Sequence, residues 1–355
     1  MPIVAQTFPF VIGVDTHAKT HTLAILASDG RHVDTAQFPT SPTGLNRAIS
    51  WAARRTSSDL DTLWVIEGIG SYGAQLAHQV MTVGYQVAEA PRMNRGTRRG
   101  IGKSDPIDAL AIAQTTLPLN LNKLRQPRDD NGIRAGLRVL ADARSDMNKQ
   151  RSAHINQLTA LVRTINLGID ARHPLTLTQT RQIAAWRVRD EPIATHIARL
   201  EATRLATSIT ELDTQLKNNQ ASLLALLKQT PAAPLLNKCG IGPITLANIL
   251  VAWSHPGRVR SEAAFAALAG VNPIPASSGN ITRYRLNHGG DRRLNNALYT
   301  ITLTRSHFDP QTRDYITRRT TQGLTHKEII RCLKRYLARQ IYRDLQDLYN
   351  PATTI

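Results

Sequence analysis

The chain has 355 residues, and its 44 Lys and Arg against 26 Asp and Glu give a formal net charge of +18. A hydrophobic fraction of 41% excludes a mainly disordered chain, and the length predicts two or three domains. No apolar run reaches the roughly 18 residues of a membrane span, so no membrane partner is expected. The positive charge favours a polyanionic partner, most often nucleic acid, but does not separate a binding protein from an enzyme.

The distribution of charge and the two cysteines indicate where nucleic acid would bind along the chain and in which compartment the protein is expected. Residues 1–125 carry 12 basic and 9 acidic side chains, whereas residues 231–355 carry 17 and 7. Arg makes up 35 of the basic residues, which suits bidentate phosphate contact, although Arg-rich codon usage explains the bias equally well. Cys239 and Cys332 form neither a CxxC pair nor a disulfide framework, and no signal segment is seen, so a cytoplasmic protein is expected, associated with the bacterial nucleoid.

The first segment, residues 1–125, alternates expected strands and helices. Apolar runs predict strands at Phe8–Asp15, Thr20–Ser28, His32–Phe38, Leu63–Glu67 and Tyr85–Ala90. Helical patterns fit at about 43–55, 71–83 and 106–117. Three early strands joined by tight turns, followed by strand–helix–strand–helix, is the order of an RNase H-like α/β fold.

Four acidic residues of this segment stand at strand ends or at a helix start: Asp15, Glu67, Asp105 and Asp108. Carboxylates that converge from separate elements form the all-oxygen site that Mg²⁺ or Mn²⁺ favours, and a pair of such cations assists phosphodiester cleavage. Helix capping is the alternative for the last two, with Asp105 as N-cap before Pro106. The ordered set of four favours metal binding, which is compatible with capping.

Other catalytic patterns are weaker. No zinc-ligand spacing and no Walker-type phosphate loop is present. His17 and His21 could lie near Asp15, but surface or turn positions are the expectation for both.

The middle segment, residues 126–230, is heptad-like and helical. One seam keeps alternating steps of three and four residues through Leu205, Ile209, Leu212, Leu216, Asn219, Leu223 and Leu226. This spacing predicts a coiled coil with a weaker partner arm at 134–166 and a turn near Asp170–Pro174. An intramolecular hairpin and a dimer both satisfy the pattern.

The last segment, residues 231–355, is predicted to be compact and mainly α-helical. It contains Ser277-Ser278-Gly279 in a Pro-rich loop, followed by Arg283, Arg285, Arg292 and Arg293. A serine becomes a nucleophile when a base, a metal or dense positive charge favours its alkoxide, although such a segment is in most proteins a turn. A tail helix at 326–346 carries a basic stripe, which is a solvated face or a phosphate-facing one: Lys327, Arg331, Lys334, Arg335, Arg339 and Arg343.

Five stretches carry a specific resemblance. VIGVDTHAKTHTLAIL, VIEGIGSYG, GKSDPIDALAIA and LAGVNPIPASSG followed by RLNHGGDRRLNNALY resemble successive motifs of the insertion sequence 110 family, the DEDD transposases, to which Piv-type DNA invertases are related. The resemblance covers roughly residues 8–345. It implies a RuvC-like domain (1–125), a coiled-coil connector (126–230) and a C-terminal transposase domain with a serine loop (231–355).

The resemblance also implies roles for residues and partners. The family's four acids fall on Asp15, Glu67, Asp105 and Asp108, which would hold Mg²⁺ or Mn²⁺, and its nucleophilic serine falls on Ser278, with Ser277 the alternative. It implies recombination of element-end and target DNA through a phosphoserine link by a homodimer or homotetramer, guided in some members by a bridge RNA. The basic residues expected to bind nucleic acid are Arg283, Arg285, Arg292, Arg293, Arg95, Arg98, Arg99 and Lys103.

Two other functions stay open at the level of sequence. In a RuvC-like nuclease or Holliday junction resolvase, the acids would hydrolyse DNA and the serine loop would only bind it. A non-catalytic nucleic-acid-binding protein is disfavoured because all four acids and the serine loop are present.

Overall fold

The computed structural model describes residues 2–91, 104–128, 132–276 and 284–350. The chain folds as two compact units, an N-terminal unit of residues 1–130 and a C-terminal unit of residues 131–355. The boundary lies close to the one expected near residue 125, and the middle and last segments share one unit. The division into three functional domains stays a prediction.

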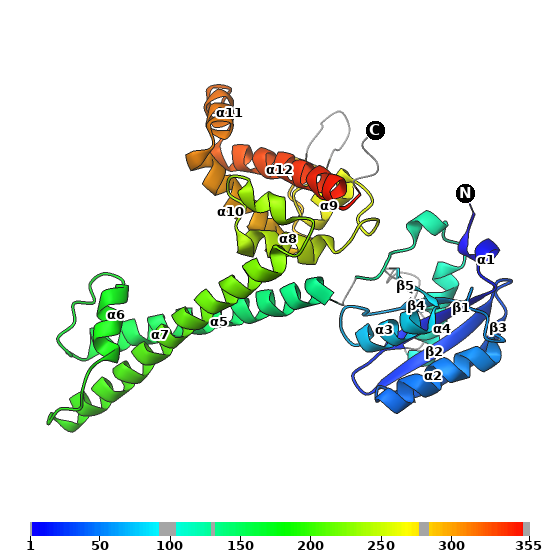
Figure 1. Cartoon of the computed structure of the whole chain (residues 1–355), viewed down its shortest axis with the longest axis horizontal. Helices are drawn as coiled ribbons and strands as arrows, with labels where there is room; N and C mark the ends of the chain where they lie inside the picture. The colour runs from blue at the N-terminus through cyan, green and yellow to red at the C-terminus, as the bar shows by residue number, and fades with distance from the viewer. Residues whose placement is uncertain (1, 92–103, 129–131, 277–283, 351–355) are drawn as a thin grey trace. The chain divides into compact units, whose positions relative to one another are not determined.

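A five-stranded mixed sheet forms the centre of the N-terminal unit (Figure 1). Its strands are β1 (Phe10–Thr16), β2 (Thr20–Ala27), β3 (His32–Pro39), β4 (Leu63–Ile66) and β5 (Gln86–Glu89). Their order is β3-β2-β1-β4-β5, in which the first three strands are antiparallel and β1, β4 and β5 run parallel. This arrangement confirms the mixed α/β fold and is consistent with an RNase H-like sheet.

Helices cover both faces of this sheet. They are α1 (Val4–Thr7), α2 (Pro42–Arg55), α3 (Ala74–Val83) and α4 (Asp105–Thr116), and a short 3₁₀ turn, η2, follows at Leu121–Lys123. Successive β1 side chains point to opposite faces, so Ile12 packs with α2 and α3, whereas Val11 packs with α1 and α4. The alternation within one strand therefore builds two separate apolar layers.

Gly13 allows α4 to lie close against β1. A Cβ at this position would lie 2.1 Å from the carbonyl oxygen of Ala109 and 2.7 Å from the amide nitrogen of Ala113. Both atoms belong to the backbone of α4, which a side-chain rearrangement cannot move. The absence of a side chain at Gly13 therefore sets the distance between α4 and the strand that carries Asp15.

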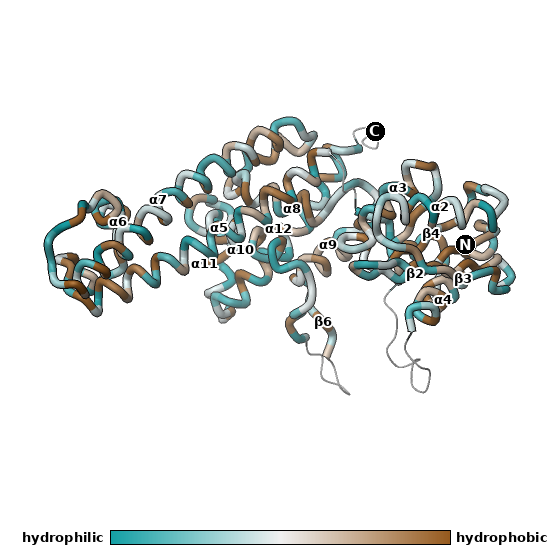
Figure 2. The backbone as a smooth tube through the Cα atoms, turned by 90° about the horizontal axis from the view of Figure 1, so that it is seen from below, coloured by the Kyte–Doolittle hydropathy of each residue, from teal (hydrophilic) through white to brown (hydrophobic). Residues whose placement is uncertain are grey.

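Two long helices, α5 (Gly132–Thr164) and α7 (Ile193–Leu227), form a hairpin in the C-terminal unit (Figure 1). Hydrophilic and hydrophobic residues alternate along both (Figure 2). The side chains of the predicted α7 seam are buried from Leu205 to Leu223, and Asn219 Nδ2 donates to the carbonyl oxygen of Leu140 at 2.9 Å. The intramolecular hairpin is thus observed, whereas a true coiled coil or a dimer stays a prediction.

The expected turn near Asp170–Pro174 lies within the connection between α5 and α7, which is longer than a single turn. The connection between the long helices includes a further helix, α6 (Leu177–Ala184), which packs against α7. Thr176 and Gln179 begin α6 with reciprocal capping hydrogen bonds, and Ile183 is fully buried. A single helix of eight residues gives too short a periodic pattern to stand out from a loop.

The remaining elements form a mostly helical bundle around Trp253, Phe265, Leu298 and Ile341. They are η3 (Ala233–Asn237), α8 (Pro243–Trp253), α9 (Glu262–Leu268), β6 (Ile274–Pro275), β7 (Tyr284–Arg285), α10 (Arg292–Phe308), α11 (Pro310–Thr321) and α12 (His326–Tyr349). The tail helix α12 continues three residues beyond the expected end. Among the described residues, no helix is long and apolar enough to cross a membrane.

Candidate functional site

Parallel pairing brings Asp15 and the backbone of Glu67 to the same end of the sheet. Asp15 lies near the end of β1, and Glu67 follows directly after β4. The Glu67 amide donates to the carbonyl oxygen of Val14 at 3.0 Å, and Thr16 Oγ1 donates to the carbonyl oxygen of Glu67 at 2.9 Å. These bonds fix the start of the loop after β4 against the strand that carries Asp15.

The first turn of α4 supplies the other two predicted acids. Ser104 is the N-cap and Asp105 the first helical residue, so the predicted capping role of Asp105 is wrong by one position. The Asp108 amide donates to the carbonyl oxygen of Ser104 at 3.0 Å. Because neither acid is the N-cap, helix capping does not account for the Asp105 side chain.

The imidazole of His17 lies close to the carboxylates of both Asp15 and Asp105. Its Nε2 lies 3.1 Å from Asp15 Oδ2 and 3.5 Å from Asp105 Oδ1. These three residues each offer a ligand atom, and the three atoms lie within 4.8 Å of one another, which is a spacing that can hold a metal ion. Gln37 Nε2 on β3 also lies 3.5 Å from Asp105 Oδ2. The arrangement is a possible acidic metal-binding group.

The electrostatic surroundings of Asp15 favour a nearby cation. Its side chain is buried, and this burial raises the pKa of Asp15; His17 lowers that pKa, whereas Asp108 and Asp105 raise it. Burial in low dielectric and neighbouring like charges both disfavour the ionised carboxylate. A bound cation would offset both effects, so the donor set suits a divalent metal.

His17 is exposed just after β1, as expected, whereas His21 differs from expectation. His17 is half exposed but contacts two carboxylates, and its spacing of two residues from Asp15 places both on one side of an extended chain. His21 is 1% exposed rather than at the surface, and burial lowers its pKa. His17, which was expected to be a surface or turn residue that could lie near Asp15, is therefore part of the candidate site.

Two family models match the chain in order. A model of the DEDD type, described as a transposase, matches residues 12–167, and one described as the transposase IS116/IS110/IS902 family matches residues 232–317. Together they cover about two thirds of the chain. The chain belongs to the IS110 family of transposases. The first match includes all four acids, and the second includes the serine segment.

Relatives from insertion elements support this membership along the whole chain. An uncharacterized 42 kDa protein of element IS900 from Mycobacterium paratuberculosis is 26% identical over 98% of both chains. The 44.8 kDa protein of IS116 from Streptomyces clavuligerus is 22% identical over 97% of both. The 43.6 kDa protein of IS110 from Streptomyces coelicolor is 30% identical over 40% of this chain and 36% of its own. Family membership implies a DNA-processing enzyme that binds DNA.

Several predicted residues of this IS110-family transposase lie outside the described residues: Ser277, Ser278, Arg283, Arg95, Arg98, Arg99 and Lys103. Of the other predicted nucleic-acid contacts, Arg285 on β7 and Arg292 at the start of α10 are exposed. Arg293 is exposed as well, and it forms an ion pair with Asp142 of α5. That ion pair ties α10 to the long hairpin and gives Arg293 a structural contact.

Proposed function

We propose that this transposase cuts and rejoins the DNA of an insertion element at a site that requires Mg²⁺ or Mn²⁺. The observation that carries the proposal is the convergence of Asp15 and Asp105 on His17 from β1 and α4. Asp108 and Glu67 would complete the ligand set from the same end of the sheet. When bound, the metal would lower the charge of the attacked phosphate and stabilise the leaving oxygen.

Ser278 is the proposed nucleophile, on the strength of the motif LAGVNPIPASSG and the arginines that follow it. Its Oγ would form a bond to the DNA phosphorus as the bond from phosphorus to one deoxyribose oxygen breaks. The serine proton leaves as the departing oxygen gains one, so the exchange is balanced without hydrolysis. Arg285 and Arg292 would bind the phosphate oxygens and offset their negative charge in the transition state.

A bridge RNA and a homodimer or homotetramer are the proposed partners. The sequence shows no recognisable helix-turn-helix reader of bases, which suits guidance by an RNA. RNA–DNA pairing would supply the choice of sequence, while the basic protein contacts backbone and shape. Sequencing of the RNA that purifies with the native protein tests this partner.

Trapping of protein–DNA adducts tests the proposed chemistry. The unmutated chain, Ser278→Ala, Ser277→Ala and Asp15→Ala are incubated with element-end DNA and Mg²⁺, and covalent adducts are resolved under denaturing conditions. We expect adducts from the unmutated chain and from Ser277→Ala, and none from Ser278→Ala or Asp15→Ala.

Each other outcome selects a different function. Adducts from Ser278→Ala would exclude this serine as the nucleophile. Free DNA ends without any adduct would favour the RuvC-like nuclease or junction resolvase. Binding without cutting by the unmutated chain would leave only a non-catalytic nucleic-acid-binding protein.

A further inference from the structure

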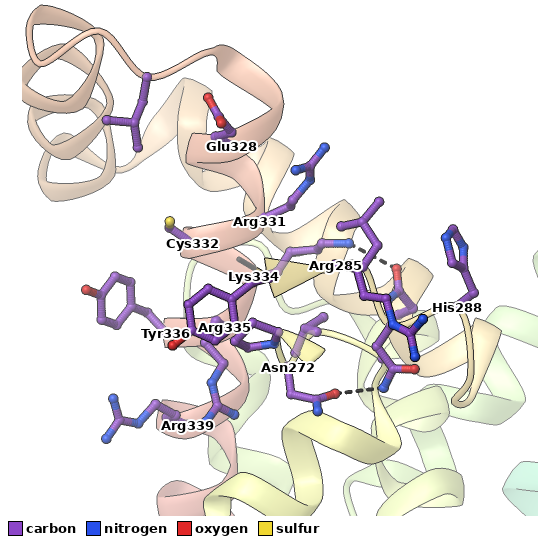
Figure 3. A pocket seen from close by; sticks show the side chains of 18 residues that line it. Asn272, Arg285, His288, Glu328, Arg331, Cys332, Lys334, Arg335, Tyr336 and Arg339 are labelled. Carbon is purple, nitrogen blue, oxygen red and sulfur yellow. Dashed lines mark hydrogen bonds between the residues drawn. The ribbon is translucent and has the colours of Figure 1, made fainter. Parts of the chain in front are cut away.

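A hollow of about 790 Å³ lies between the β6–β7 hairpin and α12 (Figure 3). Its size falls within the range of small-ligand sites, large enough for a nucleotide. Asn272, Asn287 and His288 line one side, and Asn287 Nδ2 donates to Asn272 Oδ1 at 2.7 Å. The hollow therefore has a wall of polar side chains that is braced by its own hydrogen bond.

The lining carries an excess of positive charge. Its cations are Arg285, Arg331, Lys334, Arg335 and Arg339, and Glu328 is its acidic member. Glu328 accepts hydrogen bonds from the Thr325 amide at 2.9 Å and from Thr325 Oγ1 at 2.7 Å, which cap α12. Its carboxylate is thus already engaged at the helix start.

The basic stripe on α12 divides into two parts. Arg339 and Arg343 form ion pairs with Glu262 of α9, so their charge is compensated and they tie two helices together. No ion pair to an acid is found for Arg331, Lys334 or Arg335 within the described part of the chain. These three lie one turn apart or less and, with Lys327, are the stripe members without an ion pair among the described residues. The hydrogen bonds from Thr325 lower the pKa of the Glu328 carboxyl, and Arg331 lies near enough to help lower it.

Two of these cations are partly withdrawn from water. Lys334 Nζ donates to Asn295 Oδ1 at 3.0 Å, and burial, together with Arg331, lowers the pKa of Lys334. Arg335 Nη1 is buried with no hydrogen-bond partner among the described residues. A buried donor without an acceptor is costly, and an anionic oxygen in the hollow would remove this cost.

We propose that this hollow binds an unpaired DNA strand, with Arg331, Lys334 and Arg335 on a phosphate and an adjacent base against Tyr336 or Tyr284. The inference rests on the proposed function. Tyr284 and Tyr336 are 64% and 55% exposed, and aromatic side chains beside a basic groove are typical of single-strand binding. DNA is favoured because β6 and β7 pair Ile274 with Arg285 and so flank, along the chain, the segment with Ser278.

Fluorescence anisotropy on the full chain tests this binding. The probes are a labelled single-stranded DNA of about 20 nucleotides, the same sequence as RNA, and its DNA duplex. The variant Arg331→Gln/Arg335→Gln is compared with the control Lys327→Gln/Arg343→Gln, which removes the same charge from the same helix outside the hollow. We expect affinity for single-stranded DNA to fall about tenfold or more in the first and at most about threefold in the control.

The remaining outcomes are decisive as well. Equal losses in both double variants, or a larger loss for RNA or duplex than for single-stranded DNA, would overturn the proposal. Arg335→Lys, which keeps the charge but loses the fork, should give an intermediate affinity. Equal thermal unfolding midpoints exclude misfolding. Adduct formation by the unmutated chain tests the proposed function separately, so either idea can fail alone.

Discussion

The side chain of Asp15 is buried, unlike the other acidic side chains that the structure describes in the N-terminal unit. It is 7% exposed, near Asp105 and Asp108, and His17 lies between it and Asp105. Two carboxylates around one imidazole give mixed oxygen and nitrogen ligands, which divalent cations of the Mn²⁺ type accept. His17 is therefore the residue at which the metal proposal is most easily probed without altering the acids.

His17→Gln should weaken Mn²⁺ binding by about tenfold, because one ligand or its orienting contact is lost while the acids remain. Isothermal titration of the full chain with Mn²⁺ measures the affinity. His32→Gln is the matched control, since His32 is exposed on β3 and contacts Thr35. An unchanged affinity in His17→Gln would remove His17 from the site.

The positions of the acidic residues in the fold could be predicted from the sequence, whereas their side-chain contacts could not. Asp15 and Glu67 follow apolar runs, so their positions at one end of the sheet could be inferred from the strand order. The contact of His17 with Asp105 depends on the conformation of the loop after β1 and on the distance between α4 and β1. Neither feature leaves a periodic pattern in the sequence from which it could be predicted. Residues 277–283 fall outside the described part, so the serine remains predicted from its motif alone.

At the scale of elements, the crossing of α4 over β1 positions two of the four acids. Gly13 permits backbone contact that any side chain would block. Apolar alternation predicted both elements, but not the distance between them. Helix α6 was not predicted from the sequence for a related reason. A helix of eight residues is too short to show a full amphipathic pattern, even when it is capped.

Gly13→Ala should lower the free energy of unfolding by about 3 kcal/mol, because its methyl group would overlap the backbone of Ala109 and Ala113. Urea unfolding followed by circular dichroism gives the value. Gly70→Ala is the control, since no atom lies within 4 Å of a Cβ there. Equal stability of the two variants would show that α4 is not held this closely.

The start of α7 carries a pH-dependent contact. Arg199 donates to both carboxylate oxygens of Glu191 at 2.7 and 2.6 Å and lies over the Trp186 ring. These hydrogen bonds lower the pKa of Glu191, so their stabilisation is present above the unfolded pKa and is lost as the pH falls through the lower folded pKa.

Glu191→Gln should therefore lower the thermal unfolding midpoint at pH 7 and have a smaller effect as the pH falls below about 4.3, the ordinary glutamate value. Differential scanning calorimetry across this range measures the difference from the unmutated chain. A difference that stays constant from neutral to acid pH would contradict the ion pair.

At the scale of the whole molecule, the charge separates between the two units. Residues 1–130 carry 13 basic and 11 acidic side chains, whereas residues 131–355 carry 31 and 15. The unit with the candidate metal group is nearly neutral, and the unit with the basic hollow carries most of the excess. This division suits a protein that binds cations with one unit and phosphates with the other.

DNA affinity should accordingly fall steeply with salt, with most of the slope set by the C-terminal unit. Arg331→Gln/Arg335→Gln should reduce the slope of log affinity against log salt by about one to two. Arg47→Gln, an exposed change on α2, should leave it nearly unchanged. Anisotropy titrations at several NaCl concentrations give the slopes, and equal slopes for all three proteins would refute the assignment.

The most direct test of the central claim is the rate at which the chain cuts element-end DNA as Mg²⁺ is varied. We expect no cutting in chelator, a rise with Mg²⁺, and a loss of about a hundredfold or more in Asp105→Asn. Asp29→Asn, a turn residue that pairs with Arg31, should cut at the unmutated rate. Cutting in chelator, or an Asp105→Asn rate equal to that of Asp29→Asn, would contradict it.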